Sequence, residues 1–100
     1  MKLPKGTKFV VSEEVTVMGQ TYWHGAYTGG FRCTVPKGTI VLSLKEIRPV
    51  TLGFICIPEN REHFEKRFVP EKDRNSPKYA GYSLFFWRWH LKRKVRLLDS

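Results

Sequence analysis

Residues 82–98 read YSLFFWRWHLKRKVRLL and combine five aromatic with five Lys or Arg side chains. Over residues 85–97, odd positions are apolar and even positions are polar, with one exception in each set. This alternation is typical of strands with one buried face. We therefore predict two strands with a bend near residues 92–93, in which Phe85, Trp87 and Trp89 face the core.

A continuous α-helix over residues 85–97 is the competing interpretation of the same stretch. A helical template gives an apolar stripe through Leu84, Trp87 and Leu91, but it leaves Phe85 and Trp89 outside the stripe. The strand interpretation accounts for more of the large side chains, so we prefer it.

The predicted strand has a cationic face, which carries Arg88, Lys92, Lys94 and Arg96. Such a stripe attracts phosphates and gains affinity by releasing their counterions. We therefore predict that these four residues contact nucleic acid. The alternative is a solvated strand whose charges only prevent edge-to-edge aggregation.

The first 57 residues also favour strands. Pro-Lys-Gly-Thr occurs at residues 4–7 and again at 36–39, each time as a turn before a β-branched segment. Gly19-Gln20 predicts a hairpin turn, and Tyr27-Thr28-Gly29-Gly30 predicts a further reversal. Pro58, early acidic and late basic residues, and a closing Pro70 predict one short helix over residues 58–68.

These elements define the expected architecture. The chain of 100 residues has room for one compact domain, residues 1–100, with a turn-rich loop at about 69–81. The fold class is mainly β, a small curled antiparallel sheet or a partly open SH3-like barrel with one short helix.

Composition sets limits on the partner and the compartment. The formal net charge of +9 favours acidic partners such as nucleic acid. The apolar runs are too short for a membrane-spanning helix, and the start MKLPK does not resemble a secretion signal. We expect a cytoplasmic protein without membrane contact, whose Cys33 and Cys56 are reduced core residues.

Aromatic residues beside glycines suggest a second kind of surface. We predict that the candidate interaction residues are exposed in reversals, where they would serve a protein, a peptide or a nucleic acid base equally well. They are Tyr22, Trp23, Tyr27, Tyr79 and Tyr82.

No spacing among the titratable residues matches a catalytic or metal-binding signature, so we predict neither a catalytic residue nor a metal or other cofactor. The leading function is a small basic, non-catalytic binding module that contacts nucleic acid. The first alternative is a protein- or peptide-interaction module. The second is a small metal-independent ribonuclease or toxin-like enzyme that uses His24 or His90 with Arg88 and Lys92 on the phosphate.

Overall fold

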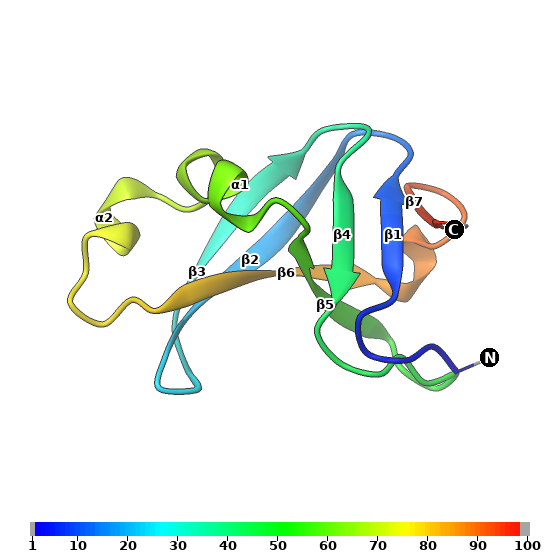
Figure 1. The fold of residues 1–100 in the computed structure, drawn as a ribbon, viewed down its shortest axis with the longest axis horizontal. Helices are drawn as coiled ribbons and strands as arrows, with labels where there is room; N and C mark the ends of the chain where they lie inside the picture. The colour runs from blue at the N-terminus through cyan, green and yellow to red at the C-terminus, as the bar shows by residue number, and fades with distance from the viewer. Residues whose placement is uncertain (1, 99–100) are drawn as a thin grey trace.

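The computed structural model describes residues 2–98, which form one antiparallel sheet of seven strands with two short helices and a 3-10 turn (Figure 1). The sheet order is β3-β2-β6-β5-β4-β1-β7. The elements are β1 (Lys8–Val11), β2 (Val15–Trp23), β3 (Ala26–Val35), β4 (Ile40–Ser43), β5 (Gly53–Pro58), α1 (Arg61–Phe68), α2 (Glu71–Arg74), β6 (Gly81–Trp87), η1 (Arg88–His90) and β7 (Val95–Leu97). The predicted mainly β, curled antiparallel sheet is confirmed.

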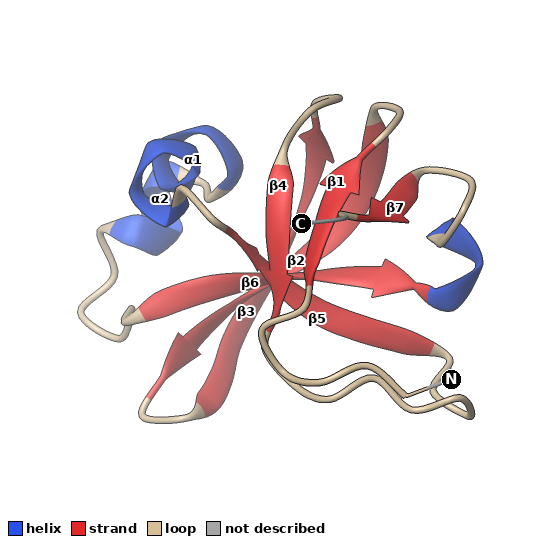
Figure 2. Ribbon diagram, turned by 45° about the vertical axis from the view of Figure 1, so that its right-hand side comes forward, coloured by secondary structure: helices blue, strands red, loops and turns tan. Residues whose placement is uncertain are grey.

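The sheet curls so that its two ends enclose the core. Strands β1 and β4 run at a steep angle to β6 (Figures 1 and 2). The ring centroids of Phe9 and Phe54 are 5.3 Å apart, and those of Phe54 and Phe86 are 5.8 Å apart, so aromatic contacts connect β1, β5 and β6. Within residues 2–98, β3 and β7 remain as the two edges, so the sheet is open.

Both Pro-Lys-Gly-Thr copies form the predicted turns. The Thr39 amide donates to the Pro36 carbonyl at 3.3 Å, and Gly38 has φ +93°, as the third position of a type II turn requires. The first copy repeats this geometry, with Gly6 at φ +87°. The strands that follow the two turns, β1 and β4, pair with each other. One local turn motif therefore starts two neighbouring strands.

The hairpin predicted at Gly19-Gln20 is wrong, because β2 continues through it to Trp23. The turn lies at His24-Gly25, where both residues have positive φ, 51° and 79°, as in a type I′ hairpin. The reversal predicted at residues 27–30 is also absent, because β3 continues through these residues, with only a register shift opposite Thr21 and Tyr22.

Gly19 makes room for an aromatic ring from the neighbouring strand, which the sequence alone does not reveal. It lies directly opposite Phe31 on β3, and a Cβ added to Gly19 would lie 2.2 Å from the Phe31 Cζ. The Phe31 ring therefore lies across β2 at Gly19, in space that any side chain would fill. The glycine permits close ring packing, and its backbone stays in the strand.

The predicted helix exists but starts later than expected, at Arg61, because Pro58 is the last residue of β5. The Tyr82 hydroxyl donates to the Arg61 carbonyl at 2.8 Å and ties α1 to the inner face of β6. The predicted loop at 69–81 contains the short helix α2. No helix within residues 2–98 is long and apolar enough to cross a membrane.

The C-terminal segment is neither one helix nor two strands joined by a narrow bend. Strand β6 ends at Trp87, η1 follows, and β7 begins only at Val95. The side chains of β6 also face the opposite way from the prediction: Leu84 and Phe86 are buried, whereas Trp87 is exposed.

Candidate functional site

The outer face of the sheet, opposite the core, carries an aromatic cluster. Met18 on β2 and Ile55 on β5 both pair with Phe85 on β6, so the three side chains form one row across this face. Trp87, two residues along β6, extends the same face. A sheet face in solvent is usually polar, so this apolar row is unusual.

The cluster has a defined internal packing. The Phe85 ring covers Gly53, where an added Cβ would lie 2.1 Å from the Phe85 Cζ. The Trp87 ring meets Phe85 edge-on, with ring centroids 5.0 Å apart and planes at 89°. Trp87 and Trp89 are nonetheless 48% and 56% exposed, so both offer ring surface to a ligand. The prediction that these two tryptophans face the core is wrong.

His90 fixes the position of Trp89. Its Nδ1 accepts the Trp87 backbone N–H at 3.0 Å, which closes the 3-10 turn. The ring centroids of Trp89 and His90 are 4.1 Å apart, so the tryptophan rests against a buried imidazole. Burial, and secondarily the charge of Lys94, lowers the pKa of His90 and favours the neutral form that this hydrogen bond requires.

A cavity of about 240 Å³ lies in this cluster. Its lining residues are Thr16, Val17, Met18, Arg32, Phe85, Trp87, Trp89 and His90. Arg32 is exposed on β3 and pairs with Met18, so its charge lies at the border of the apolar row. No Asp or Glu of residues 2–98 lines the cavity.

The predicted basic face does not exist as one strand face. Arg88 lies in η1, and its Nη1 donates to the Arg48 carbonyl at 3.0 Å. Lys94 pairs with Glu13 at 3.1 Å, which offsets its charge. Lys92 and Arg96 are exposed and line a separate groove beside β7.

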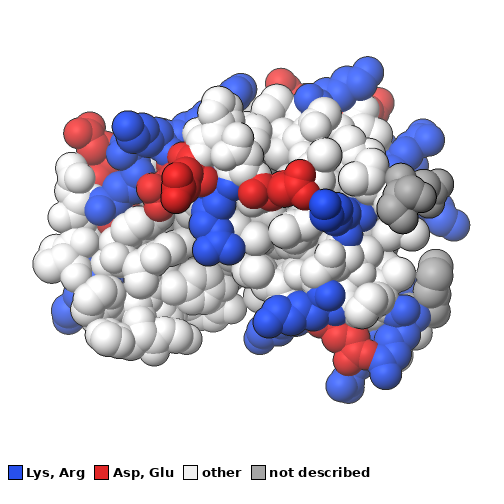
Figure 3. Space-filling view, in the orientation of Figure 1, with Lys and Arg blue, Asp and Glu red and all other residues white. Residues whose placement is uncertain are grey.

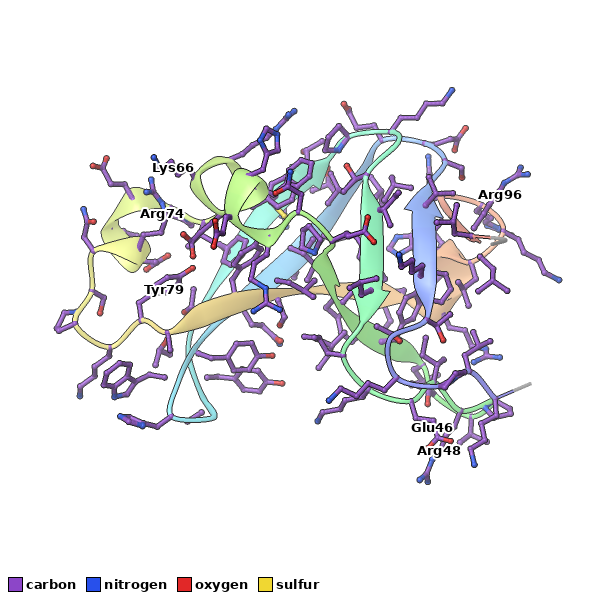
Figure 4. All side chains as sticks on the ribbon, viewed as in Figure 1. Glu46, Arg48, Lys66, Arg74, Tyr79 and Arg96 are labelled. Atoms are coloured by element: carbon purple, nitrogen blue, oxygen red, sulfur yellow. The ribbon has the colours of Figure 1, made fainter. Side chains whose placement is uncertain are left out.

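Figure 4 shows Arg96 at the opposite end of the molecule from Arg74 and Tyr79. Of the predicted cations, Arg88 is the one that immediately adjoins both exposed tryptophans in the chain.

The predicted interaction aromatics divide into two groups. Tyr82 is buried in the core, and the Tyr79 hydroxyl donates to Glu65 Oε2 at 2.7 Å, so both hold α1 in place. Tyr22, Trp23 and Tyr27 lie around the β2–β3 hairpin, and only Tyr27 of these is strongly exposed, at 61%. Figure 3 shows the region over this hairpin as largely uncharged on the viewed side.

A second cavity, of about 350 Å³, lies near the hairpin on the same outer face. Tyr22, Tyr27, Lys45 and Ile55 are among the residues that line it. The Tyr22 and Tyr27 rings are 5.1 Å apart. Because Ile55 pairs with Phe85, this cavity adjoins the first one across the β5–β6 ladder.

Of the two histidines in the ribonuclease hypothesis, His90 lies near Arg88 and Lys92 in the chain and His24 does not. His24 lies in the β2–β3 turn, whereas Arg88 follows the far end of β6. His90 is only 3% exposed and uses Nδ1 internally. Within residues 2–98, no group of three His, Cys, Asp or Glu is arranged to hold a metal ion.

The described site differs from the predicted one in its aromatic members. The alternation predicts Phe85, Trp87 and Trp89 in the core, and it makes no prediction about Met18 as a site residue. The one sequence signal for them is that β6 is apolar at both odd and even positions. No protein-family model, curated protein or solved structure matches this chain.

Proposed function

We propose that this chain is a non-catalytic binding module that holds single-stranded nucleic acid on the outer face of its sheet. The observation that carries the proposal is the pair of exposed rings, Trp87 and Trp89, beside Arg32, which lines the same cavity. Bases stack on exposed aromatic rings with about 1–3 kcal/mol per base, and arginines add phosphate and cation–π contacts.

The shape of the site favours an unpaired strand. Bases in a duplex hide their faces against one another, whereas a single strand presents them to a flat aromatic surface. Here the aromatic surface is a sheet face, and Met18, Phe85 and Trp87 occupy adjoining positions on β2 and β6. This arrangement suits stacking on bases more than insertion into a groove.

Charge supports the same partner. The chain carries a net +9, and no carboxylate of residues 2–98 lines the cavity beside the tryptophans. A single strand releases counterions when its phosphates bind such a site, so its affinity falls as the salt concentration rises. The logarithm of the binding constant falls by about 0.7 per neutralised phosphate for each tenfold rise in salt.

A protein partner is the competing function, and a specific observation favours it. Val50 and Leu52 are exposed apolar side chains, and the Leu52 carbonyl accepts the Arg88 backbone N–H at 2.7 Å, so this loop adjoins η1. Apolar loop residues beside tryptophans are common at protein interfaces. Arg32, and a cavity lining without Asp or Glu from the described part of the chain, lead us to prefer nucleic acid.

The test is titration of a fluorescently labelled oligothymidine with the purified protein at several salt concentrations. We expect binding that weakens with salt, and a loss of roughly 5- to 150-fold for Trp87→Ala and for Trp89→Ala. Leu97→Ala is the matched control, because Leu97 is exposed on β7, away from the cavity.

Three results would contradict the proposal: no binding at low salt, equal affinity for wild type and both tryptophan variants, or an equal loss in Leu97→Ala. If a labelled protein fragment instead binds and Leu52→Ala abolishes that binding, the protein-interaction function replaces it.

A further inference from the structure

The outer face continues beyond the tryptophans to the Tyr22–Tyr27 pair. Tyr22 pairs with Gly81 at the start of β6, and Trp87 ends the same strand. At about 3.4 Å per residue, the six steps between them span roughly 20 Å. The second cavity therefore begins at Ile55, beside the Phe85 of the first cavity, and extends to Tyr22 and Tyr27 at the hairpin.

The middle of this face carries polar groups, of which Gln20 is half-buried and Ser83 is fully buried. The Tyr22 hydroxyl lies 2.7 Å from the Ser83 Oγ and donates to Gln20 Oε1 at 3.3 Å. The amide nitrogen of Gln20 has no hydrogen-bond partner within residues 2–98, so its two N–H groups are available to an acceptor. Carbonyl oxygens and ring nitrogens on the edges of bases are acceptors of this kind.

Cations accompany both ends. Arg32 lines the cavity at the tryptophan end, and Lys45 lines the cavity at the tyrosine end. Neither cavity includes a carboxylate from the described part of the chain. A ligand lying along the face therefore meets aromatic surface and positive charge twice, with hydrogen-bonding groups between.

We propose that the outer face binds a single strand lengthwise along β6, from Trp89 to Tyr27, which rests on the function proposed above. A stacked strand advances about 3.4 Å per nucleotide, so roughly 20 Å accommodates about six nucleotides, and an extended strand fewer. The aromatic rings at the tryptophan end and at the tyrosine end each stack on bases. Gln20 contacts the base edges between the two ends.

The experiment compares oligothymidines of about three and about eight nucleotides, short enough to occupy one end and long enough to reach both. Trp87→Ala should weaken the binding of both lengths. Tyr27→Ala should weaken only the longer oligonucleotide, by roughly 5- to 150-fold, because a short one settles on the tryptophans. Tyr27 is 61% exposed in a hairpin, so its truncation leaves the core intact.

A matched pair of lysine variants tests the path without changing any ring. Lys45→Gln should reduce the salt slope for the longer oligonucleotide only. Lys66→Gln, on α1 (Figure 4), should leave both slopes unchanged.

The failures of the two proposals are distinguishable. If Trp87→Ala weakens binding but Tyr27→Ala and Lys45→Gln affect neither length, the lengthwise path is wrong and the proposed function stands. Equal weakening of both lengths by Tyr27→Ala likewise contradicts the path. If neither oligonucleotide binds the wild-type protein, both proposals are wrong.

Discussion

Replacing Gly19 with alanine tests the packing that keeps β2 continuous. The new Cβ would lie 2.2 Å from the Phe31 Cζ, whereas carbon atoms in contact prefer about 3.5–4.0 Å. The buried ring must therefore move by more than about 1 Å in a close-packed core, and overpacking of this kind costs about 1–3 kcal/mol. The reduced backbone freedom of alanine in the unfolded chain offsets about 0.4–1 kcal/mol of that cost.

The net expectation is a loss of about 1–2 kcal/mol in the free energy of unfolding, measured by urea denaturation with tryptophan fluorescence. For a domain of this size, each 1 kcal/mol lowers Tm by about 4–8 °C. Gly81→Ala is the control, because an added Cβ there meets nothing within 4 Å. We expect that variant to be neutral or slightly stabilised.

A double-mutant cycle of Gly19→Ala with Phe31→Leu distinguishes two reasons why alanine would be destabilising at position 19: contact with the Phe31 ring, or a turn that needs glycine. If Gly19 occupied a tight turn with positive φ, alanine would also be destabilising there, but the cost would not depend on residue 31. The structure predicts that the shorter leucine relieves the clash, with a coupling energy of about 0.5–3 kcal/mol. An equal cost of Gly19→Ala in both backgrounds would refute the reasoning.

Three further predictions concern groups outside the outer face. Tyr79→Phe removes the 2.7 Å hydrogen bond to Glu65 and should lower the free energy of unfolding by about 1 kcal/mol in urea; no change would contradict a stabilising bond. Because the folded-state pKa of His90 is lowered from 6.5, the unfolded state binds its proton more tightly. Stability should therefore fall as the pH drops below about 6.5, until it passes the folded-state pKa, and fall less in His90→Gln. Burial raises the pKa of Cys33 to about 12 and raises that of Cys56 further, so iodoacetamide should react with both only on unfolding; rapid alkylation of the native protein would contradict this.

The local parts of the fold were predictable from the sequence because local chemistry decides them. The Pro-Lys-Gly-Thr turns need only a fixed proline φ and a glycine at positive φ, and both are visible in four residues. The helix at Arg61–Phe68 follows from Pro58, Pro70 and the charge pattern between them. These predictions were correct to within a few residues.

The glycines in strands were not predictable in the same way. Gly19 and Gly53 have the same sequence signature as turn glycines, but each lies beneath an aromatic ring from a neighbouring strand. Phe31 is twelve residues from Gly19, and Phe85 is further still from Gly53. Only the register of the sheet brings each ring to its glycine, and that register was unknown at the sequence level.

The orientation of β6 shows why the site was missed. Tyr82, Leu84 and Phe86 face the core, while Phe85 and Trp87 face outward, so both faces of this strand are apolar. Alternation identifies the buried face of a strand only when its other face is polar. The polar positions that define the predicted alternation lie after Trp87, where β6 has already ended.

Only one face of β6 is needed for the core. Phe86 and Leu84 are fully buried and make that core, whereas Phe85, Trp87 and Trp89 add apolar surface that remains in contact with water. Contiguous exposed apolar surface favours aggregation when it has no partner. The function proposed above gives this surface a partner, so the outward rings should be the first residues changed when that ligand is sought.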